Sequence, residues 1–188
     1  MPPIRFFAQK NMHVNYEFKA SCTDINELEQ RLLALDPRFA GTDHQIDTYF
    51  NTASNRLKLR EGNIENALIH YERSNVAGAK QSNVILYQHQ PDAALKQILA
   101  RTLGIRVVVD KLRRIYFIGN VKFHFDVVES LGSFVEVEAI DTDGTIGIER
   151  LKSQCAEYAG LFAIRPEDYI DVSYSDLLLA KKSSTENG

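Results

Sequence analysis

Three stretches of the chain repeat apolar residues at the spacing of an amphipathic helix. They are Asp24–Leu35, Pro91–Leu103 and Thr145–Ala159. In each stretch, apolar side chains three or four residues apart form one face, as Leu28, Leu32 and Leu35 do in the first. End signals agree with these bounds, because Asp24 can cap a helix start and Gly104 can follow a helix end. The pattern predicts three helices that each need an apolar surface to cover.

Between these helices, apolar and polar residues alternate, which is typical of strands with two different faces. The alternating segments are His13–Ala20, Gln45–Phe50, Arg56–Glu61, Leu68–Arg73, Val84–His89, Arg106–Lys111, Arg113–Ile118, Val121–Val128 and Phe134–Ile140. So many strands with few helices predict a mostly antiparallel sheet, and such a sheet tends to curl or close. We therefore predict an α+β fold: an antiparallel closed or nearly closed β-barrel of about eight strands, with helices packed outside.

The composition is that of a globular protein with one domain. The chain has 188 residues, of which 44% are hydrophobic and 25% charged. A chain of this length buries about 70% of its unfolded surface, so it needs no disulfide or metal merely to stay folded. We expect a single domain over residues 1–182, followed by a disordered tail over residues 183–188, where the composition becomes small and polar.

Several function classes are not expected from the sequence. Cys22 and Cys155 lie far apart, and the five histidines form no Cys/His cluster, so we expect neither a disulfide framework nor a zinc site. The start has no long apolar core, and no stretch approaches the ~20 apolar residues of a membrane span, so we expect a cytoplasmic protein without membrane partners. A pI of about 6.0 and the lack of an RNA-recognition motif count against nucleic acid as a partner.

The formal net charge of −3 hides an uneven distribution along the chain. Residues 1–55 carry five basic and seven acidic side chains, residues 56–114 carry eleven and five, and residues 115–188 carry six and thirteen. A basic middle therefore lies between two acidic flanks.

Within the predicted strands, charges of one sign stand two residues apart and so share a face. The pairs are Lys58 and Arg60, Lys111 and Arg113, and Glu136 and Glu138. A sheet with one solvated face explains most alternating patterns, but like charges at this spacing repel each other. If the helices cover the apolar outer face, the charges point into the barrel, where they are costly unless paired. This predicts a hydrated interior that binds a polyanion.

Carboxylates from other strands supply the second half of such a site. Glu17, Asp126, Glu136 and Glu138 are hard oxygen ligands suited to Mg²⁺ or Mn²⁺. Both ions bind through few carboxylates together with phosphate oxygens of a substrate. The basic strands would then hold phosphates while the acidic strands hold the metal.

These residues stand in a chain that resembles the CYTH superfamily, the triphosphate tunnel metalloenzymes, and within it the class IV adenylate cyclases. The segments that carry the resemblance are NYEFKA, DTYFNTASNRLKLREG, LIHYERSN, LGIRVVVDKLRRIYFIGNVKFHFDVVESLGSFVEVEAI and SYSDLLL. The resemblance implies a barrel enclosing a tunnel that binds a triphosphate, ATP above others, with Mg²⁺ or Mn²⁺. Members of this cyclase class also suggest a homodimer.

The resemblance assigns roles to individual residues. The cations that would contact the triphosphate are Lys19, Lys58, Arg60, Arg73, Lys111 and Arg113. Glu17, Asp126, Glu136 and Glu138 would be the metal ligands or their supports, and Glu17, Lys19, Lys111 and Arg113 would be catalytic. The family's opening motif, Glu-x-Glu-x-Lys, falls on residues 15–19 with Asn15 in place of the first Glu. Asn15 offers a neutral oxygen but removes one negative charge.

Three functions follow from this site and stay open at the level of sequence. The first is conversion of ATP to 3′,5′-cyclic AMP and pyrophosphate, driven by positioning and charge neutralisation because no residue is an obvious dedicated base. The second is a triphosphatase that hydrolyses inorganic triphosphate, thiamine triphosphate or a nucleoside triphosphate. The third, motivated by Asn15, is a polyphosphate- or nucleotide-binding module with little turnover. The cations are common to all three.

Overall fold

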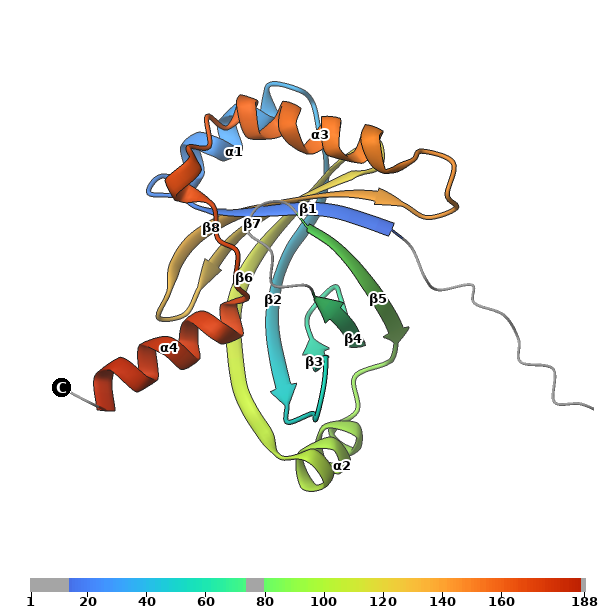
Figure 1. Ribbon diagram of the computed structural model, residues 1–188, viewed down its shortest axis with the longest axis vertical. Coiled ribbons are helices and arrows are strands. Elements are labelled where there is room, and N and C mark those ends of the chain that lie inside the picture. Colours follow the sequence, from blue (N-terminus) through green and yellow to red (C-terminus); the bar gives the residue numbers. More distant parts are fainter. Residues whose placement is uncertain (1–13, 74–79, 187–188) are drawn as a thin grey trace, which may run out of the picture.

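The computed structural model describes residues 14–73 and 80–186, and the side chains of residues 14–71 and 84–185. Eight antiparallel strands close into a barrel in the order β1-β5-β4-β3-β2-β6-β7-β8, with β8 pairing back to β1 (Figure 1). The strands are β1 (Val14–Ser21), β2 (Arg38–Phe50), β3 (Arg56–Glu61), β4 (Ala67–Arg73), β5 (Lys80–Gln88), β6 (Ile105–Ile118), β7 (Val121–Val128) and β8 (Gly132–Asp141). The helices are α1 (Ile25–Leu33), α2 (Ala93–Leu103), α3 (Ile148–Leu161) and α4 (Tyr174–Glu186). The predicted α+β barrel is confirmed.

Two predicted strands, 106–111 and 113–118, are one continuous strand, β6. The alternation passes through the supposed break without changing phase: Lys111 and Arg113 are buried inside, while Leu112 between them is exposed outside. β2 begins at Arg38, seven residues before the predicted start. A register shift between Phe39 and Gly41 interrupts its alternation, so the first half of the strand is hard to recognise in the sequence.

Helices α1 and α3 lie side by side over one outer face of the barrel, across β1, β7 and β8 (Figure 1). Asp24 caps α1 by accepting the backbone N–H groups of Asn26 and Glu27. Leu28 and Leu32 of α1 and Leu151 of α3 then pack in the same cluster as the outward Phe and Val side chains of the strands. This apolar layer fixes which face of these strands points outward, so their polar residues point into the barrel.

Helix α3 starts at Ile148, three residues after the predicted start. The preceding residues form a loop because the buried carboxylate of Asp141 accepts N–H bonds from Gly144, Ile146 and Gly147. Gly144 and Gly147 adopt positive φ angles of 79° and 82° there, which suit glycine and do not continue a helix.

Helix α4 has no counterpart among the predicted helices. Tyr174 and Leu178 near its start pack in one apolar cluster with Val107 and Val109 of β6. Residues 183–186, expected to belong to a disordered tail, are helical. The hydroxyls of residues 183–185 bond back to carbonyls four residues earlier, which lets a polar segment continue the helix.

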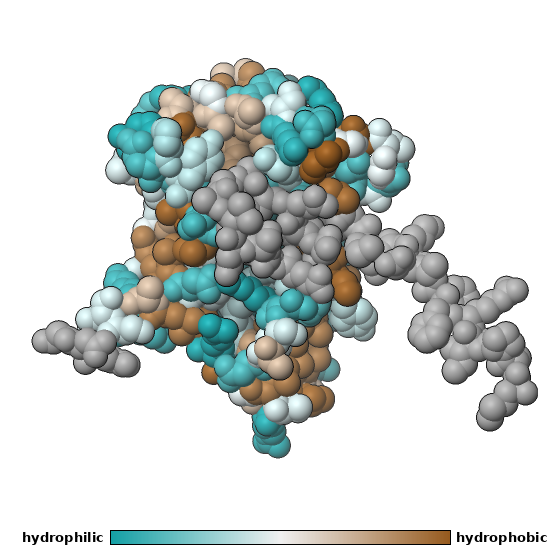
Figure 2. Space-filling model, in the orientation of Figure 1, coloured by the Kyte–Doolittle hydropathy of each residue, from teal (hydrophilic) through white to brown (hydrophobic). Residues whose placement is uncertain are grey.

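The outer surface is polar over much of α1 and α3, and apolar side chains reach it lower on the barrel (Figure 2). Among these exposed apolar residues are Ile98 of α2 and Ile85 and Tyr87 of β5. None of the helices in residues 14–73 and 80–186 is long and apolar enough to cross a membrane.

Candidate functional site

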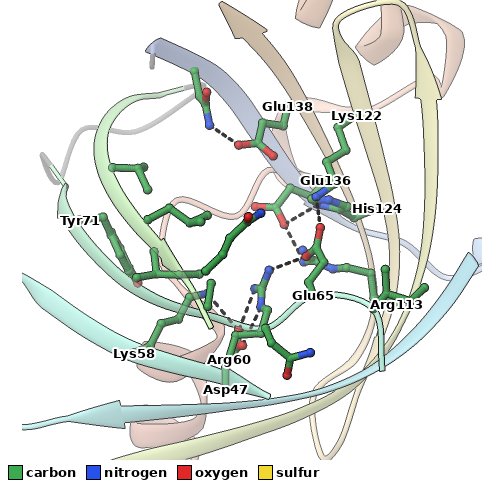
Figure 3. A pocket seen from close by; sticks show the side chains of 18 of the residues that line it. Asp47, Lys58, Arg60, Glu65, Tyr71, Arg113, Lys122, His124, Glu136 and Glu138 are labelled. Atoms are coloured by element: carbon green, nitrogen blue, oxygen red, sulfur yellow. Dashed lines mark hydrogen bonds and ion pairs between the residues drawn. The ribbon is translucent and has the colours of Figure 1, made fainter. Parts of the chain in front are cut away.

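A cavity of about 800 Å³ occupies the interior of the barrel, within the size range of small-molecule sites. All eight strands contribute side chains to its wall, and Ser173 and Tyr174 at the start of α4 close one part of it. Its lining is unusual for a small-molecule site because it carries many charges of both signs, grouped by strand (Figure 3).

Five of the six predicted triphosphate-binding cations line this cavity: Lys19, Lys58, Arg60, Lys111 and Arg113. They come from β1, β3 and β6, which are far apart in sequence and are brought together by closure of the barrel. The sixth, Arg73, is the last residue of β4, and its side chain lies outside the part of the chain that the structure describes. The expectation that the charged faces point inward is therefore met for each of the described cations.

Asp47 of β2, which the sequence did not single out, binds three of these cations, of which Figure 3 labels Lys58 and Arg60. The distances to its carboxylate oxygens are 2.9 Å from Lys58 Nζ, 2.8 Å from Arg60 Nε and 2.7 Å from Lys111 Nζ. Burial by itself favours the protonated acid, but the charges of Arg60, Lys111 and Lys58 hold the pKa of Asp47 well below its ordinary value. The carboxylate is therefore ionised, and this part of the wall keeps a surplus of positive charge.

Arg113 belongs to a second cluster around Asp126 of β7. Arg113 donates two parallel hydrogen bonds to Asp126, at 2.6 and 2.5 Å, and a third to Glu136 at 2.9 Å. Tyr174 donates to the same Asp126 carboxylate at 2.8 Å, and Lys19 Nζ lies 3.4 Å from Glu136 and 4.3 Å from the centre of the Tyr174 ring. Asp126 thus lies behind Arg113 rather than on the cavity wall, and it orients that guanidinium.

Glu65 and Lys122 are two further charged residues of the cavity that sequence reasoning missed. Glu65 stands in the loop between β3 and β4 and binds Arg60 at 2.9 Å on one side and Lys122 of β7 on the other (Figure 3). Asp43 holds this loop by accepting the backbone N–H groups of Ile64 at 2.9 Å and Glu65 at 3.0 Å. Although Glu65 is largely buried, Lys122 and Arg60 lower its pKa. Glu65 therefore pairs with both Arg60 and Lys122, two cations that an entering phosphate could bind.

His124 of β7 lines the cavity as a neutral side chain. Burial, with the charges of Arg113 and Lys122, lowers its pKa to about 3, although Glu136 acts in the opposite direction at 3.3 Å. At neutral pH it is therefore a weak base, and a general-base role does not fit it.

Oxygen donors gather where β1 pairs with β8. Glu17 stands opposite Glu138 in the strand pairing, and both line the cavity together with Asn15. Asn15 donates its Nδ2 hydrogen to Glu138, and its buried Oδ1 accepts no hydrogen bond from any described residue. Burial, with the nearby Glu136 and Glu65, raises the pKa of Glu138. The Asn15 oxygen is an acceptor without a donor among the described residues, and the ionised form of Glu138 is disfavoured. A cation bound between them would satisfy the first and stabilise the second.

The described side chains include no group of three or more His, Cys, Asp or Glu residues already arranged to hold a metal ion. Of the four predicted ligands, Asp126 and Glu136 are engaged by cations. Glu17, Glu138 and the amide oxygen of Asn15 line the cavity at one place, and oxygens of these kinds suit a divalent ion that keeps waters and takes further oxygens from a phosphate.

The wall of the cavity formed by β4 and β5 is apolar and aromatic. β4 contributes Ile69 and Tyr71, and β5 contributes Val84 and Leu86. Burial raises the pKa of Tyr71, so its phenol stays protonated. The cavity therefore joins a charged half suited to phosphates and a divalent ion with an apolar half suited to a flat organic group.

Comparison with known proteins gives one family and several solved structures. A family model for the CYTH domain matches residues 13–159. The structure of PH1012 from Pyrococcus horikoshii OT3 superposes with a TM-score of 0.73 at 22% identity, over 87% of this chain and 98% of that one. A provisionally assigned adenylate cyclase from Vibrio parahaemolyticus gives 0.68 at 18% identity, over 90% and 99% of the two chains. These likenesses concern the fold.

A third solved structure carries an activity in its description. HpAC1 from Hippeastrum, a provisionally assigned adenylyl cyclase described as having a dominant triphosphatase activity, superposes with a TM-score of 0.58 at 16% identity, over 92% of this chain and 96% of that one. A search of curated proteins finds no match.

Proposed function

Because this chain belongs to the CYTH domain family, we propose that it is a divalent-metal-dependent enzyme acting on a triphosphate, with ATP as substrate and 3′,5′-cyclic AMP and pyrophosphate as products. The observation that carries the proposal is the cavity lined by Lys19, Lys58, Arg60, Lys111 and Arg113. Buried cations are costly, and so many in one cavity suit an anionic ligand of high charge that binds together with a metal ion held by carboxylates of the same cavity.

Charge is separated inside the cavity in the way a metal–triphosphate complex requires. Around Asp47, three cations meet one carboxylate, which leaves positive charge for phosphate oxygens. Glu17, Glu138 and Asn15 would hold the divalent ion at the β1–β8 side. When bound there, the ion would neutralise phosphate charge and favour ionisation of a coordinated hydroxyl.

The apolar half of the cavity favours a nucleoside triphosphate over inorganic triphosphate. Ile69, Tyr71, Val84 and Leu86 offer a surface against which a base can pack, and inorganic triphosphate has no group for it. With the base on this wall and the phosphates on the cations, the ribose lies between the two halves. Cyclisation requires that this arrangement hold the 3′-hydroxyl close to the α-phosphorus.

In the reaction, the 3′ oxygen forms a bond to the α-phosphorus as the bond to the bridging oxygen breaks, and pyrophosphate leaves. Lys and Arg side chains that bind the leaving pyrophosphate stabilise its developing charge. Asp126 and Glu136 keep Arg113 oriented for this task through its three hydrogen bonds. The 3′ proton passes to solvent water, since His124, whose pKa is lowered, is a weak base.

Hydrolysis of a triphosphate is the second candidate. The same cations would bind the phosphates, and water would attack the terminal phosphorus in place of the ribose hydroxyl. The Hippeastrum neighbour is described as having a dominant triphosphatase activity, which supports hydrolysis as the second candidate.

The products formed from defined substrates test the proposal. The purified protein is incubated with ATP, inorganic triphosphate or thiamine triphosphate and Mg²⁺ or Mn²⁺, with Lys111→Met as a control for contaminating enzymes. Cyclic AMP with equimolar pyrophosphate supports the cyclase. Orthophosphate alone supports the triphosphatase, and tight binding without product supports a binding module. In the last case, Asn15→Glu, which restores the family's first carboxylate, should produce activity.

A further inference from the structure

Asp47 lies at the centre of one wall of the cavity. It stands on β2 directly opposite Arg60 of β3 in the strand pairing. Lys58 reaches it from the same strand as Arg60, and Lys111 reaches it from β6 on the other side. One carboxylate therefore binds cations from the strands on both sides of β2.

The hydrogen-bonding capacity of Asp47 is fully used. Its oxygens accept four bonds: from Arg60 Nε at 2.8 Å and Arg60 Nη2 at 3.0 Å, from Lys58 Nζ at 2.9 Å and from Lys111 Nζ at 2.7 Å. A carboxylate has about four acceptor positions. With these positions filled, Asp47 has no free lone pair for a metal ion, and a carboxylate has no hydrogen to donate to a phosphate.

Lys111 is the cation that depends most on Asp47. The charged groups that face it are Asp47 from β2, Lys58 and Arg60 from β3, Arg113 on its own strand and Asp126 from β7. Burial, together with Arg60, Arg113 and Lys58, lowers the pKa of Lys111 to about 7, and Asp47 acts in the opposite direction. Without this carboxylate, three like charges would be left side by side on one wall.

We propose that Asp47 is a positioning residue of the triphosphate site, an internal counter-ion that gathers Lys58, Arg60 and Lys111 on one wall of the cavity without contacting the substrate. The inference rests on the proposed binding of a triphosphate. It extends that proposal because it assigns the preorganisation of three phosphate-binding cations to one buried carboxylate. Asp47 also favours the protonated form of Lys111, because its negative charge opposes the effects of burial and of the neighbouring cations.

Binding of inorganic triphosphate in the presence of a metal chelator tests the role without requiring turnover. Affinity is measured by calorimetry between pH 5.5 and 8 for the wild type and Asp47→Asn, and the ratio of the two affinities at each pH cancels the titration of the phosphate itself. Asp47→Asn should lower the pKa of Lys111 by at least one unit, and one unit is about a tenfold effect. The ratio of wild-type to variant affinity should therefore be about tenfold larger at pH 8 than at pH 5.5.

Two further variants separate positioning from folding. Asp141→Asn alters another buried carboxylate, one that accepts backbone N–H groups outside the cavity, and should leave the affinity unchanged at every pH. Asp47→Glu keeps the charge but moves the carboxylate, so it should lower the affinity by a factor that does not vary with pH. If Asp47→Asn does not fold, the affinity of Asp47→Glu is the test. A positioning role predicts a lower affinity for triphosphate, whereas a merely structural role predicts a lower melting temperature with unchanged affinity.

The outcomes distinguish this inference from the proposal on which it rests. A pH-independent ratio for Asp47→Asn, or an unchanged affinity for Asp47→Glu, would overturn the role of Asp47 while triphosphate binding stands. Absence of triphosphate binding by the wild type would overturn both.

Discussion

Two buried carboxylates in this barrel hold cations in different ways. Asp47 accepts hydrogen bonds from three separate cations, Lys58, Arg60 and Lys111. Asp126 accepts two bonds from one guanidinium, that of Arg113, and one from the hydroxyl of Tyr174. Both carboxylates are almost fully buried, so exposure does not explain the difference. The number of charges around each one does.

The Asp126 group is electrically balanced and the Asp47 group is not. Arg113 and Lys19 face Asp126 and Glu136, so charges cancel one for one. Around Asp47, three positive charges meet one negative charge, and Glu65, which also pairs with Arg60, is shared with Lys122, so positive charge stays in excess. A balanced pair stabilises the folded chain only as long as it is complete, whereas a surplus of like charge costs stability until an anion binds. We infer that the first group is built for orientation and the second for binding.

Breaking the balanced group should have the largest effect. Arg113→Met leaves Asp126 buried without its cation, and we expect the free energy of unfolding to fall by about 3–5 kcal/mol. Lys111→Met, on the same strand and equally buried, leaves Asp47 with two partners and should change it by less than about 1 kcal/mol. Urea unfolding at pH 6.5 measures both. Equal losses for the two variants would contradict the distinction between the groups.

Lys111→Met should instead reduce binding. At pH 6.5 the wild-type Lys111 is mostly protonated, since its pKa is about 7. A hydrogen bond to a charged group contributes about 1.5–3 kcal/mol, so we expect the affinity for inorganic triphosphate to fall about 10- to 100-fold. Calorimetric titration measures the loss. An unchanged affinity would remove Lys111 from the site.

The pH dependence of stability sharpens the same comparison. The folded-state pKa of Lys111, about 7, lies below its ordinary value of 10.5, so between these pH values the unfolded chain binds more protons. Stability should therefore rise with pH in this window, by about 1.4 kcal/mol per pH unit at most. Lys111→Met should remove the rise. Folding lowers the pKa of Asp126 below its ordinary value of 3.8. The ionised carboxylate therefore stabilises the folded chain above pH 3.8, and this stabilisation is lost as the pH falls through the lower, folded-state pKa.

The smallest expected effect concerns Glu65, which spans Arg60 and Lys122. Glu65→Gln removes a negative charge from the phosphate side of the cavity, and we expect triphosphate affinity to rise about threefold, in the range of a partly exposed ion pair. Glu61→Gln is the matched control, because Glu61 pairs with Lys96 and does not line the cavity. A lower affinity for Glu65→Gln would show that this carboxylate helps the ligand to bind.

Much of the fold can be predicted from local patterns. β3 and β7 have the predicted bounds, and α1 begins beside the predicted cap, Asp24. The failures are the first half of β2, whose alternation a register shift interrupts at Gly41, and helix α4, whose polar second half resembles a tail. In both cases pairing or packing with β6 stabilises a segment whose own residues give a weak signal.

The candidate site divides in the same way. The two-residue spacing of Lys58 and Arg60 is enough to predict that both share one face of a strand. Asp47 has no such neighbour of its own charge, and Glu65 lies in a turn, so nothing local marked either of them. The spacing also makes Lys111 and Arg113 equivalent, whereas the structure gives them different carboxylates.

The sequence by itself determined most of the strands, the helices that cover them, the inward direction of the charges and the family to which the chain belongs. Each of these depends on residues that lie close together in the chain. Only the tertiary structure decided which carboxylate neutralises which cation. That choice depends on barrel closure, which sets β2 between β3 and β6 and so places one buried aspartate among three cations. Pairing of this kind is a property of distance in space, and spacing along the chain does not encode it.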